Sequence, residues 1–325
     1  MPHSKILVTG GAGFIGGHLC QLLLEEGCQV TAIDDLSTGR LDNIAALHQQ
    51  PGFSFVRETI LNALVLDRLV SECDAVVHLA AAVGVQLILD HPIRTIETNI
   101  LGSEAVLRAA ARYGKKVLLA STSEVYGKSE QVPFSEDDDR VMGATTRGRW
   151  SYAETKAMDE FLALAYHREQ GLPAVIFRLF NTVGPRQSGQ YGMVVPRFVN
   201  WALRGEALLV HGDGQQTRCF CHVTDVIRAI AGLLEHSGAV GQIHNIGSTE
   251  EVSILELAEH AKAITGSVSP IHFVPYQQLG SDFEDMRRRV PDTRKIQALL
   301  GWQPRHTLDD ILRDVAADLN VKRET

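Results

Sequence analysis

The sequence predicts an α/β fold: a doubly wound parallel sheet followed by a smaller C-terminal α/β domain. Two observations indicate this fold. Strand-like and helix-like stretches alternate through residues 1–182, and a glycine-rich turn follows the first strand-like stretch. Such alternation is typical of parallel sheets whose two faces are covered by helices. We therefore expect one domain at residues 1–182 and a second at residues 183–325, the two packed closely together.

Six apolar stretches rich in β-branched residues are the expected strands of the sheet. They lie at residues 6–9, 29–33, 53–57, 75–79, 116–120 and 174–179. Most of the segments between them repeat apolar residues at helical spacing. After Pro185 the pattern loosens, with an apolar stretch at 207–211 and helices predicted near 223–235 and 254–265. This second part is expected to cover the carboxyl edge of the sheet, where folds of this kind bind ligands.

The turn after the first strand is a dinucleotide-binding fingerprint. It reads TGGAGFIG at residues 9–16. Gly10 allows the tight turn, Gly13 lets the backbone approach a pyrophosphate, and Gly16 lets the helix pack on the strand. Phosphates can then lie at the N-terminus of that helix, which begins near Phe14 and Ile15. The alternative is a glycine-rich turn without a ligand.

An acidic pair, Asp34 and Asp35, ends the second expected strand and argues against that alternative. A carboxylate at this place can accept hydrogen bonds from an adenosine ribose, and it would repel a 2′-phosphate. The sequence therefore predicts NAD as the cofactor rather than NADP.

Composition favours a soluble intracellular enzyme. The 325 residues are 45% hydrophobic, and the formal net charge of −8 argues against nucleic acid or an anionic membrane as partner. We find no apolar run of about 18 residues, and Met1–Ser4 is expected to lead directly into the first strand without a signal peptide. The five cysteines form no CxxC pair, and the histidines have no zinc-binding spacing. We expect reduced thiols, a cytoplasmic location and no metal.

A second group of residues indicates acid–base chemistry. Tyr152 and Lys156 lie four positions apart, so in a helix they share a face, and the ammonium group can lower the pKa of the phenol. Tyr152 could then act as a base at neutral pH. The strand ending at Ala120 leads into STSEVYG at 121–127, which would bring hydroxyls and a carboxylate to the same edge of the sheet. The alternative for an isolated tyrosine–lysine pair is a solvated helix face.

Motifs along nearly the whole chain resemble those of the extended short-chain dehydrogenase/reductase superfamily, in particular its nucleotide-sugar epimerases, dehydratases and decarboxylases. Besides those already quoted, they read DDLSTG at 34–39, HLAA at 78–81, TNILG at 98–102, YAETK at 152–156, FNTVGPR at 180–186, GDGQQTRCF at 212–220 and RRRVPDTRKI at 287–296. The resemblance implies a UDP-sugar as substrate. It also implies a homodimer formed by helices near 99–113 and 153–170.

The resemblance also implies roles for individual residues. The catalytic group would be Thr122, Ser123, Glu124, Tyr152 and Lys156. The cofactor would be held by Gly10, Gly13, Phe14, Ile15, Gly16, Asp34, Asp35, Ser37, Thr38, Gly39, Leu79, Ala80, Ala81 and Asn99, together with Tyr152 and Lys156. The nucleotide sugar would be met by Asn181, Arg186, Arg218 and Arg289.

In enzymes of this kind Tyr152 would take the proton of the sugar 4′-hydroxyl while hydride leaves C4′, which gives a 4-keto sugar. Return of hydride to the other face makes a 4-epimerase, loss of water a 4,6-dehydratase, and loss of carbon dioxide from a 6′-carboxylate a decarboxylase. Glu124 beside the catalytic threonine, with the RWxY spelling at 149–152, favours UDP-glucuronate decarboxylase.

Three alternatives stay open. In a UDP-glucuronate or UDP-glucose 4-epimerase, Glu124 would only hydrogen-bond to its neighbours, and the segment Ala80–Val83 resembles those enzymes. A 4,6-dehydratase is a further alternative. A non-catalytic NAD-binding sensor on the same fold is the alternative from a different class. The presence of Thr122, Tyr152 and Lys156 together argues for an enzyme.

Overall fold

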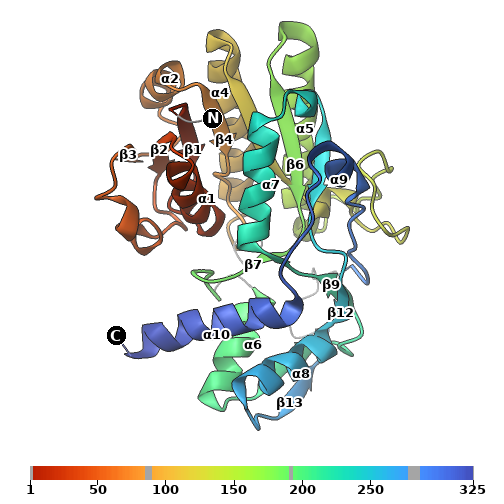
Figure 1. The fold of residues 1–325 in the computed structure, drawn as a ribbon. Coiled ribbons are helices and arrows are strands. Elements are labelled where there is room, and N and C mark those ends of the chain that lie inside the picture. Colours follow the sequence, from red (N-terminus) through yellow and green to blue (C-terminus); the bar gives the residue numbers. More distant parts are fainter. Residues whose placement is uncertain (1–2, 85–89, 190–192, 277–285, 325) are drawn as a thin grey trace.

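A computed structural model describes residues 3–84, 90–189, 193–276 and 286–324. Its centre is a seven-stranded parallel sheet with the strand order β11-β6-β5-β4-β1-β2-β3 (Figure 1). The strands are β1 (Lys5–Thr9), β2 (Gln29–Asp34), β3 (Phe53–Arg57), β4 (Ala75–His78), β5 (Lys116–Thr122), β6 (Ala174–Leu179) and β11 (Ile243–Ile246). The order reverses between β1 and β4, as in a doubly wound fold, so the predicted fold class is confirmed.

Helices cover both faces of this sheet. They are α1 (Phe14–Glu25), α7 (Val223–Glu235) and α9 (Arg294–Leu300) on one face, and α2 (Ala63–Glu72), α4 (Pro92–Tyr113) and α5 (Ser151–Gln170) on the other. Alternate residues of a strand point to opposite faces, so Ile6 and Val8 pack under α1 whereas Leu7 packs on the side of α2 and α4. All three are buried, which explains why β1 is a continuous apolar run.

The remaining elements form a smaller part below the carboxyl edge of the sheet (Figure 1). Its helices are α6 (Val194–Arg204), α8 (Ile254–Thr265) and α10 (Leu308–Glu324), packed around a separate apolar core. Its short strands are β7 (Thr182–Val183), β8 (Leu208–His211), β9 (Thr217–Cys219), β10 (Cys221–His222), β12 (Glu251–Ser253) and β13 (Ile271–Val274). Short 3-10 turns are η1 (Leu41–Asn43), η2 (Ala45–Leu47), η3 (Ser123–Tyr126), η4 (Gly148–Trp150) and η6 (Ser237–Ala239).

The chain does not divide at residue 182 as the sequence suggested. After β10 it returns to the large sheet, where α7 packs against α1 and β11 pairs with β6 as the edge strand. Helix α9 follows the same route, with Ile296 buried in the core beneath α7. The second part therefore consists of three segments, because residues 223–246 and helix α9 belong to the large sheet, and the chain crosses between the two parts five times.

The six predicted strands are all present, each within two residues of its expected ends. Strand β11 is the seventh and was not predicted, because four residues bounded by glycine and polar residues give too short a pattern. Within the described ranges, no helix combines the length and apolarity needed to cross a membrane.

Candidate functional site

The glycine-rich turn approaches the neighbouring strand so closely that side chains are excluded. Gly10 has φ 70°, and a Cβ added to it would lie 2.8 Å from the backbone nitrogen of Ala80. A Cβ on Gly16 would lie 2.1 Å from the carbonyl oxygen of Gly10. Helix α1 begins directly after this turn, so its first free N–H groups face the carboxyl edge of the sheet. The turn therefore has the shape that a pyrophosphate requires.

The two acidic residues after β2 have different surroundings. Asp34 is buried, and its carboxylate accepts hydrogen bonds from the N–H groups of Ala12 (3.0 Å) and Leu36 (2.8 Å). Burial raises the pKa of Asp34, although these hydrogen bonds oppose the rise. A Cβ on Gly39 would lie 2.7 Å from the Asp34 carboxylate, so the 37–39 segment folds back over it. Asp35 is exposed and accepts the N–H of Ser37 at 2.8 Å.

The turn after β4 is tied to the helix that carries the tyrosine. The side chain of Asn99 on α4 is buried; its oxygen accepts the N–H of Ala82 (2.8 Å), and its amide donates to the hydroxyl of Thr155 on α5 (3.3 Å). On the other side of the turn, the N–H of Ala80 donates to the hydroxyl of Thr9 at 3.2 Å. The segment Leu79–Ala81 is thus fixed between the glycine-rich turn and α5.

Thr122 and Tyr152 meet at the end of β5. Thr122 is the last residue of this strand and caps η3 by accepting the N–H of Glu124 at 3.2 Å. Its hydroxyl also hydrogen-bonds to the phenol of Tyr152, which lies in the first turn of α5. Ser123, between Thr122 and Glu124, is buried. Parallel strands end at one edge of the sheet, which is why these residues lie beside the glycine-rich turn.

The sequence-based expectation for the pKa of Tyr152 is wrong for this state of the chain. Burial raises the pKa of the phenol well above its usual value, and the negative charges of Glu124 and Asp159 raise it further. The ammonium group of Lys156 donates to Asp159 at 2.7 Å, so its charge is paired with one of the two carboxylates that raise this pKa. The tyrosine is therefore protonated here, and it needs additional positive charge beside it to act as a base.

Glu124 lies between two arginines. One carboxylate oxygen pairs with Arg149 of η4, and the other lies 3.6 Å from Nη1 of Arg289. Burial favours the protonated acid, but the charges of Arg149, Arg289 and Arg218 together lower the pKa of Glu124 to about 2. Glu124 is therefore a carboxylate at neutral pH. Arg149 was noted in the sequence only as part of a motif, and its place three residues before Tyr152 is the signal that could have identified it.

The residues expected to meet the sugar do not all lie together. Arg218 on β9 is buried and contributes to the positive charge around Glu124. Asn181 donates its amide to the carbonyl of Cys219 (3.0 Å) and so joins the end of β6 to β9. Arg186 lies elsewhere: its guanidinium donates to the carbonyl of Asn43 (2.9 Å) and contacts His18 of α1. The structure therefore gives Arg186 a contact between the two parts of the molecule rather than a place beside Arg218.

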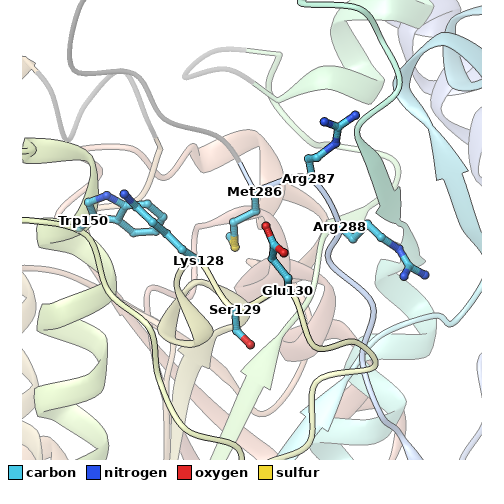
Figure 2. Close-up of a pocket in the computed structure, with 7 residues that line it drawn as sticks. All are labelled: Lys128, Ser129, Glu130, Trp150, Met286, Arg287 and Arg288. Carbon is cyan, nitrogen blue, oxygen red and sulfur yellow. The ribbon is translucent and has the colours of Figure 1, made fainter.

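Glu124, Arg149 and Arg289 are called the Glu124 cluster below. A cavity of about 560 Å³ opens beside this cluster (Figure 2). Figure 2 shows Trp150 and Lys128 on one side of it and Arg287 and Arg288 on the other, with Met286 between them. Its lining residues adjoin the cluster along the chain, since Trp150 follows Arg149 and Arg288 precedes Arg289. The remaining lining residues are Ser129 and Glu130.

Comparison with known proteins agrees with this geometry. The family model described as GDP-mannose 4,6 dehydratase matches residues 7–315. The UDP-N-acetyl-alpha-D-glucosaminuronate decarboxylase of Bacillus cytotoxicus is 42% identical, over 95% of this chain and 96% of its own. The UDP-glucuronic acid decarboxylase 1 of Danio rerio is 37% identical, over 92% of this chain and 69% of its own.

Among solved structures, the UDP-glucuronic acid 4-epimerase of Bacillus cereus, in complex with UDP-glucuronic acid and NAD, superimposes with a TM-score of 0.89. It is 33% identical, and the match covers 98% of this chain and 99% of that one. The dTDP-glucose 4,6-dehydratase of Bacillus anthracis in complex with NAD has a TM-score of 0.87 and 29% identity, over 99% of this chain and 98% of that one. The resemblance drawn from the motifs is thereby confirmed: this chain belongs to the NAD-dependent nucleotide-sugar epimerase, dehydratase and decarboxylase family of the extended short-chain dehydrogenases/reductases.

Proposed function

We propose that the protein is an NAD-dependent decarboxylase of UDP-linked hexuronic acids, of which UDP-glucuronate and its 2-acetamido analogue are the first candidates. The observation that carries the proposal is the cluster of Arg149, Glu124 and Arg289 beside Tyr152. A 4-epimerase needs no acid or base at C5′, whereas a decarboxylase has to replace the lost carboxylate on that carbon by a proton. The decarboxylases named above, at 42% and 37% identity, support the same reaction.

The residues around the glycine-rich turn fit a bound dinucleotide. We assign the pyrophosphate to the turn from Gly10 to Gly16, the adenosine ribose to Asp34, and the nicotinamide side to the turn Leu79–Ala81 with Asn99. The remaining cofactor contacts are assigned to Phe14, Ile15, Asp35, Ser37, Thr38 and Gly39. The chemistry that NAD supplies when bound is acceptance of hydride from C4′ and its return at the end of the reaction.

Tyr152 is assigned the role of base in the first proton transfer. Its phenolate accepts the proton of the 4′-hydroxyl, while the Thr122 hydroxyl, already bonded to the phenol, orients both oxygens. Ionisation of Tyr152 is disfavoured in the chain alone, so the positive charge of the nicotinamide ring and of Lys156 must lower its pKa in the complex. The result of this step is a ketone at C4′, placed β to the 6′-carboxylate.

Loss of carbon dioxide follows from that placement. The C5′–C6′ bond breaks, its electron pair moves toward the C4′ oxygen, and carbon dioxide leaves. Tyr152, which now carries the proton taken from the 4′-hydroxyl, and Thr122 lie at that oxygen, so their hydroxyls stabilise the enolate that develops there. The proton that replaces carbon dioxide at C5′ comes from solvent, because Glu124 is ionised and has none to give. We assign to Glu124 the task of holding Arg149 and Arg289 in place and of accepting hydrogen bonds from the solvent donor.

The second candidate is a UDP-glucuronate 4-epimerase, favoured by the 33% identity to the enzyme of that name. Both candidates oxidise C4′ of the same substrate, so the product decides between them. Purified protein is incubated with NAD and UDP-glucuronate, or with UDP-2-acetamido-glucuronate, and the nucleotide sugars are resolved by mass spectrometry and NMR. We expect a pentose product and one carbon dioxide for each turnover, and none of either with Tyr152→Phe. A UDP-sugar of unchanged mass with inverted C4′ would overturn the decarboxylase proposal.

We also propose a homodimer. Ile93 and Ile96 on α4, with Met158 and Phe161 on α5, are exposed apolar side chains on two helices that pack against each other. A second copy of the same pair would cover them in a four-helix arrangement with two-fold symmetry. A cytoplasmic location is proposed from the five cysteines, which are all buried and none of which forms a disulfide.

A further inference from the structure

Lys156 forms a buried ion pair with a residue of its own helix. Its Nζ donates to Oδ2 of Asp159 at 2.7 Å, and the two side chains are 3% and 1% exposed. Residues three apart lie on one face of a helix, and this face of α5 is turned toward the sheet. A buried ammonium group is costly unless a counter-ion accompanies it, so this contact determines where the charge of Lys156 can lie.

Other carboxylates near Lys156 are already engaged. Glu160, the next residue on α5, accepts two hydrogen bonds from Arg178 of β6, at 2.8 and 2.9 Å, and is also bonded to Ser121 of β5. Glu124 of η3 is held by Arg149 and Arg289, as described above. Among the described residues, Asp159 is the carboxylate left to neutralise Lys156.

Asp159 is also the end of a buried chain of hydrogen bonds across the sheet. The hydroxyl of Ser103 on α4 bonds to its carboxylate, and Nε2 of His78 lies 3.2 Å from the same hydroxyl. Nδ1 of His78 then meets the hydroxyl of Thr9 at 2.7 Å, which in turn accepts the N–H of Ala80. Burial and the charge of Lys156 lower the pKa of His78 to about 3, so the ring is neutral and adds no charge to this chain.

We propose that Asp159 is a positioning residue for the reaction: it fixes Lys156 on the face of α5 that carries Tyr152, and it links that lysine through Ser103 and His78 to the turn at Ala80. The inference rests on the proposed roles of Tyr152 and Lys156. It goes beyond them by assigning to Asp159 a direct electrostatic effect on the tyrosine. The negative charge of Asp159 disfavours the phenolate, so its removal lowers the pKa of Tyr152.

The first test is the pH dependence of C4′ oxidation, followed as reduction of NAD in a single turnover with UDP-glucuronate. Asp159→Asn keeps the size of the side chain and removes its charge. We expect the acidic limb of the pH–rate profile to shift to lower pH by about one unit, which corresponds to a tenfold change in the ionisation constant of Tyr152. The maximal rate should fall roughly tenfold, because Lys156 is no longer fixed. Asp159→Glu, which keeps the charge, should return the limb to its wild-type position.

Glu154 provides the matched control. It lies on the same helix, is 50% exposed and pairs with Arg140, so Glu154→Gln makes the same change of charge outside the buried chain. Its pH profile should equal that of the wild type. If Asp159 only supports the fold, Asp159→Asn will lower the rate without moving the limb, and the proposal fails.

A second measurement does not depend on turnover. The protein has six tyrosines, so carbon-13 label at the phenol carbon gives few NMR signals, and Tyr152 is assigned by its loss in Tyr152→Phe. In the NAD complex the Tyr152 signal of Asp159→Asn should titrate at lower pH than that of the wild type. A signal at unchanged pH overturns the inference. A shifted signal in protein that turns over neither uronate would instead overturn the proposed function alone.

Ser103→Ala serves if Asp159→Asn does not fold. The Ser103 hydroxyl stabilises the charged form of Asp159, so its loss raises the pKa of that carboxyl further. Asp159 stays charged at the pH where Tyr152 ionises, so the Tyr152 titration should not move in Ser103→Ala, whereas the rate of C4′ oxidation should fall severalfold because the link from Asp159 to the turn at Ala80 is broken. An unchanged rate in Ser103→Ala would contradict the proposal.

Discussion

Glu124 and Arg149 form an ion pair between two separate 3-10 turns, and the side chains are only 14% and 4% exposed. Turn η3 follows the strand that ends in Thr122, and η4 precedes α5, whose second residue is Tyr152. The pair therefore joins the two segments that carry the proton-transfer groups. Removal of one partner of a buried ion pair leaves the other charge uncompensated and strongly destabilises the fold. Substitutions here therefore have to preserve the shape of the side chain.

Glu124→Gln should separate the two halves of the reaction. The substitution removes the charge that holds the arginines and that raises the pKa of Tyr152. We expect C4′ oxidation to persist, while release of carbon dioxide from UDP-glucuronate slows roughly 10²-fold. The measurement compares NAD reduction with carbon dioxide formation in a single turnover. Tyr152→Phe is the control and should abolish both; equal losses in both steps for Glu124→Gln would contradict this division.

Arg149→Gln should make decarboxylation sensitive to acid. The guanidinium of Arg149 is the main group that lowers the pKa of Glu124, so without it the carboxylate takes up a proton at higher pH. Because the reaction needs the ionised form, the acidic limb of carbon dioxide release should move upward. Arg147→Gln, two residues earlier, removes an equal charge and should leave the limb in place. A limb that stays fixed in Arg149→Gln would show that Glu124 does not titrate in this range.

His244 should limit stability in acid. It lies on β11, is 1% exposed, and neither ring nitrogen has a hydrogen-bond partner in the described structure. Burial lowers the pKa of His244 from 6.5 to about 4. Between these two pH values the histidine binds a proton in the unfolded chain but not in the folded chain, so the free energy of unfolding falls as the pH drops from 6.5 toward 4. Near pH 5 this costs about 2 kcal/mol. His244→Leu should raise the free energy of unfolding, measured with urea, by that amount at pH 5 and by less at pH 7. His272→Leu, at an exposed site on β13, should not raise it.

Cofactor selectivity should follow from Asp34. Its buried carboxylate lies where the 2′-phosphate of NADP would have to enter, so NAD should bind at least tenfold more tightly than NADP by calorimetry. Gly16→Ala should weaken NAD binding by roughly tenfold to a hundredfold, because the new methyl group meets the carbonyl of Gly10. Gly189→Ala is the control, since a Cβ there makes only ordinary contacts. Equal affinity for the two dinucleotides would refute the assignment of Asp34.

Assembly should depend on Phe161. This side chain is 59% exposed on α5, one turn from Met158 and on the face opposite the sheet. Phe161→Glu places a charge in the proposed dimer contact and should give a monomer by light scattering at micromolar concentration. Phe273→Glu changes a phenylalanine of similar exposure (54%) on β13 and should leave the dimer intact. A wild-type monomer under the same conditions would remove the basis of this prediction.

The sequence could predict those features whose pattern is local. The glycine-rich turn, the strand ends and the pairing of Tyr152 with Lys156 on one helix face all depend on spacing along a short stretch. Arg149 and Glu124 could not be paired in this way, because their contact depends on how two turns meet above the sheet. Asp159 lies three residues from Lys156, so their contact was within reach, but its burial depends on α4 and β4 packing over it.

Arg186 shows the opposite limit. Its motif associates it with the sugar, yet the local backbone takes φ 68° and directs the side chain toward His18 and Asn43. Neither contact can be inferred from residues near Arg186, because both come from the first domain. Strand β11 was not predicted for a similar reason: its strand conformation depends on pairing with β6, which is distant along the chain.

The late return of the chain to the large sheet has a consequence for synthesis. Strand β6 keeps an open edge until β11 has left the ribosome, and the apolar face of α1 stays uncovered until α7 has formed. The nascent nucleotide-binding half is therefore exposed to wrong strand pairing while the intervening segments emerge. A fragment ending at residue 182 should aggregate rather than fold, whereas the whole chain can close its sheet once residues 183–246 have emerged.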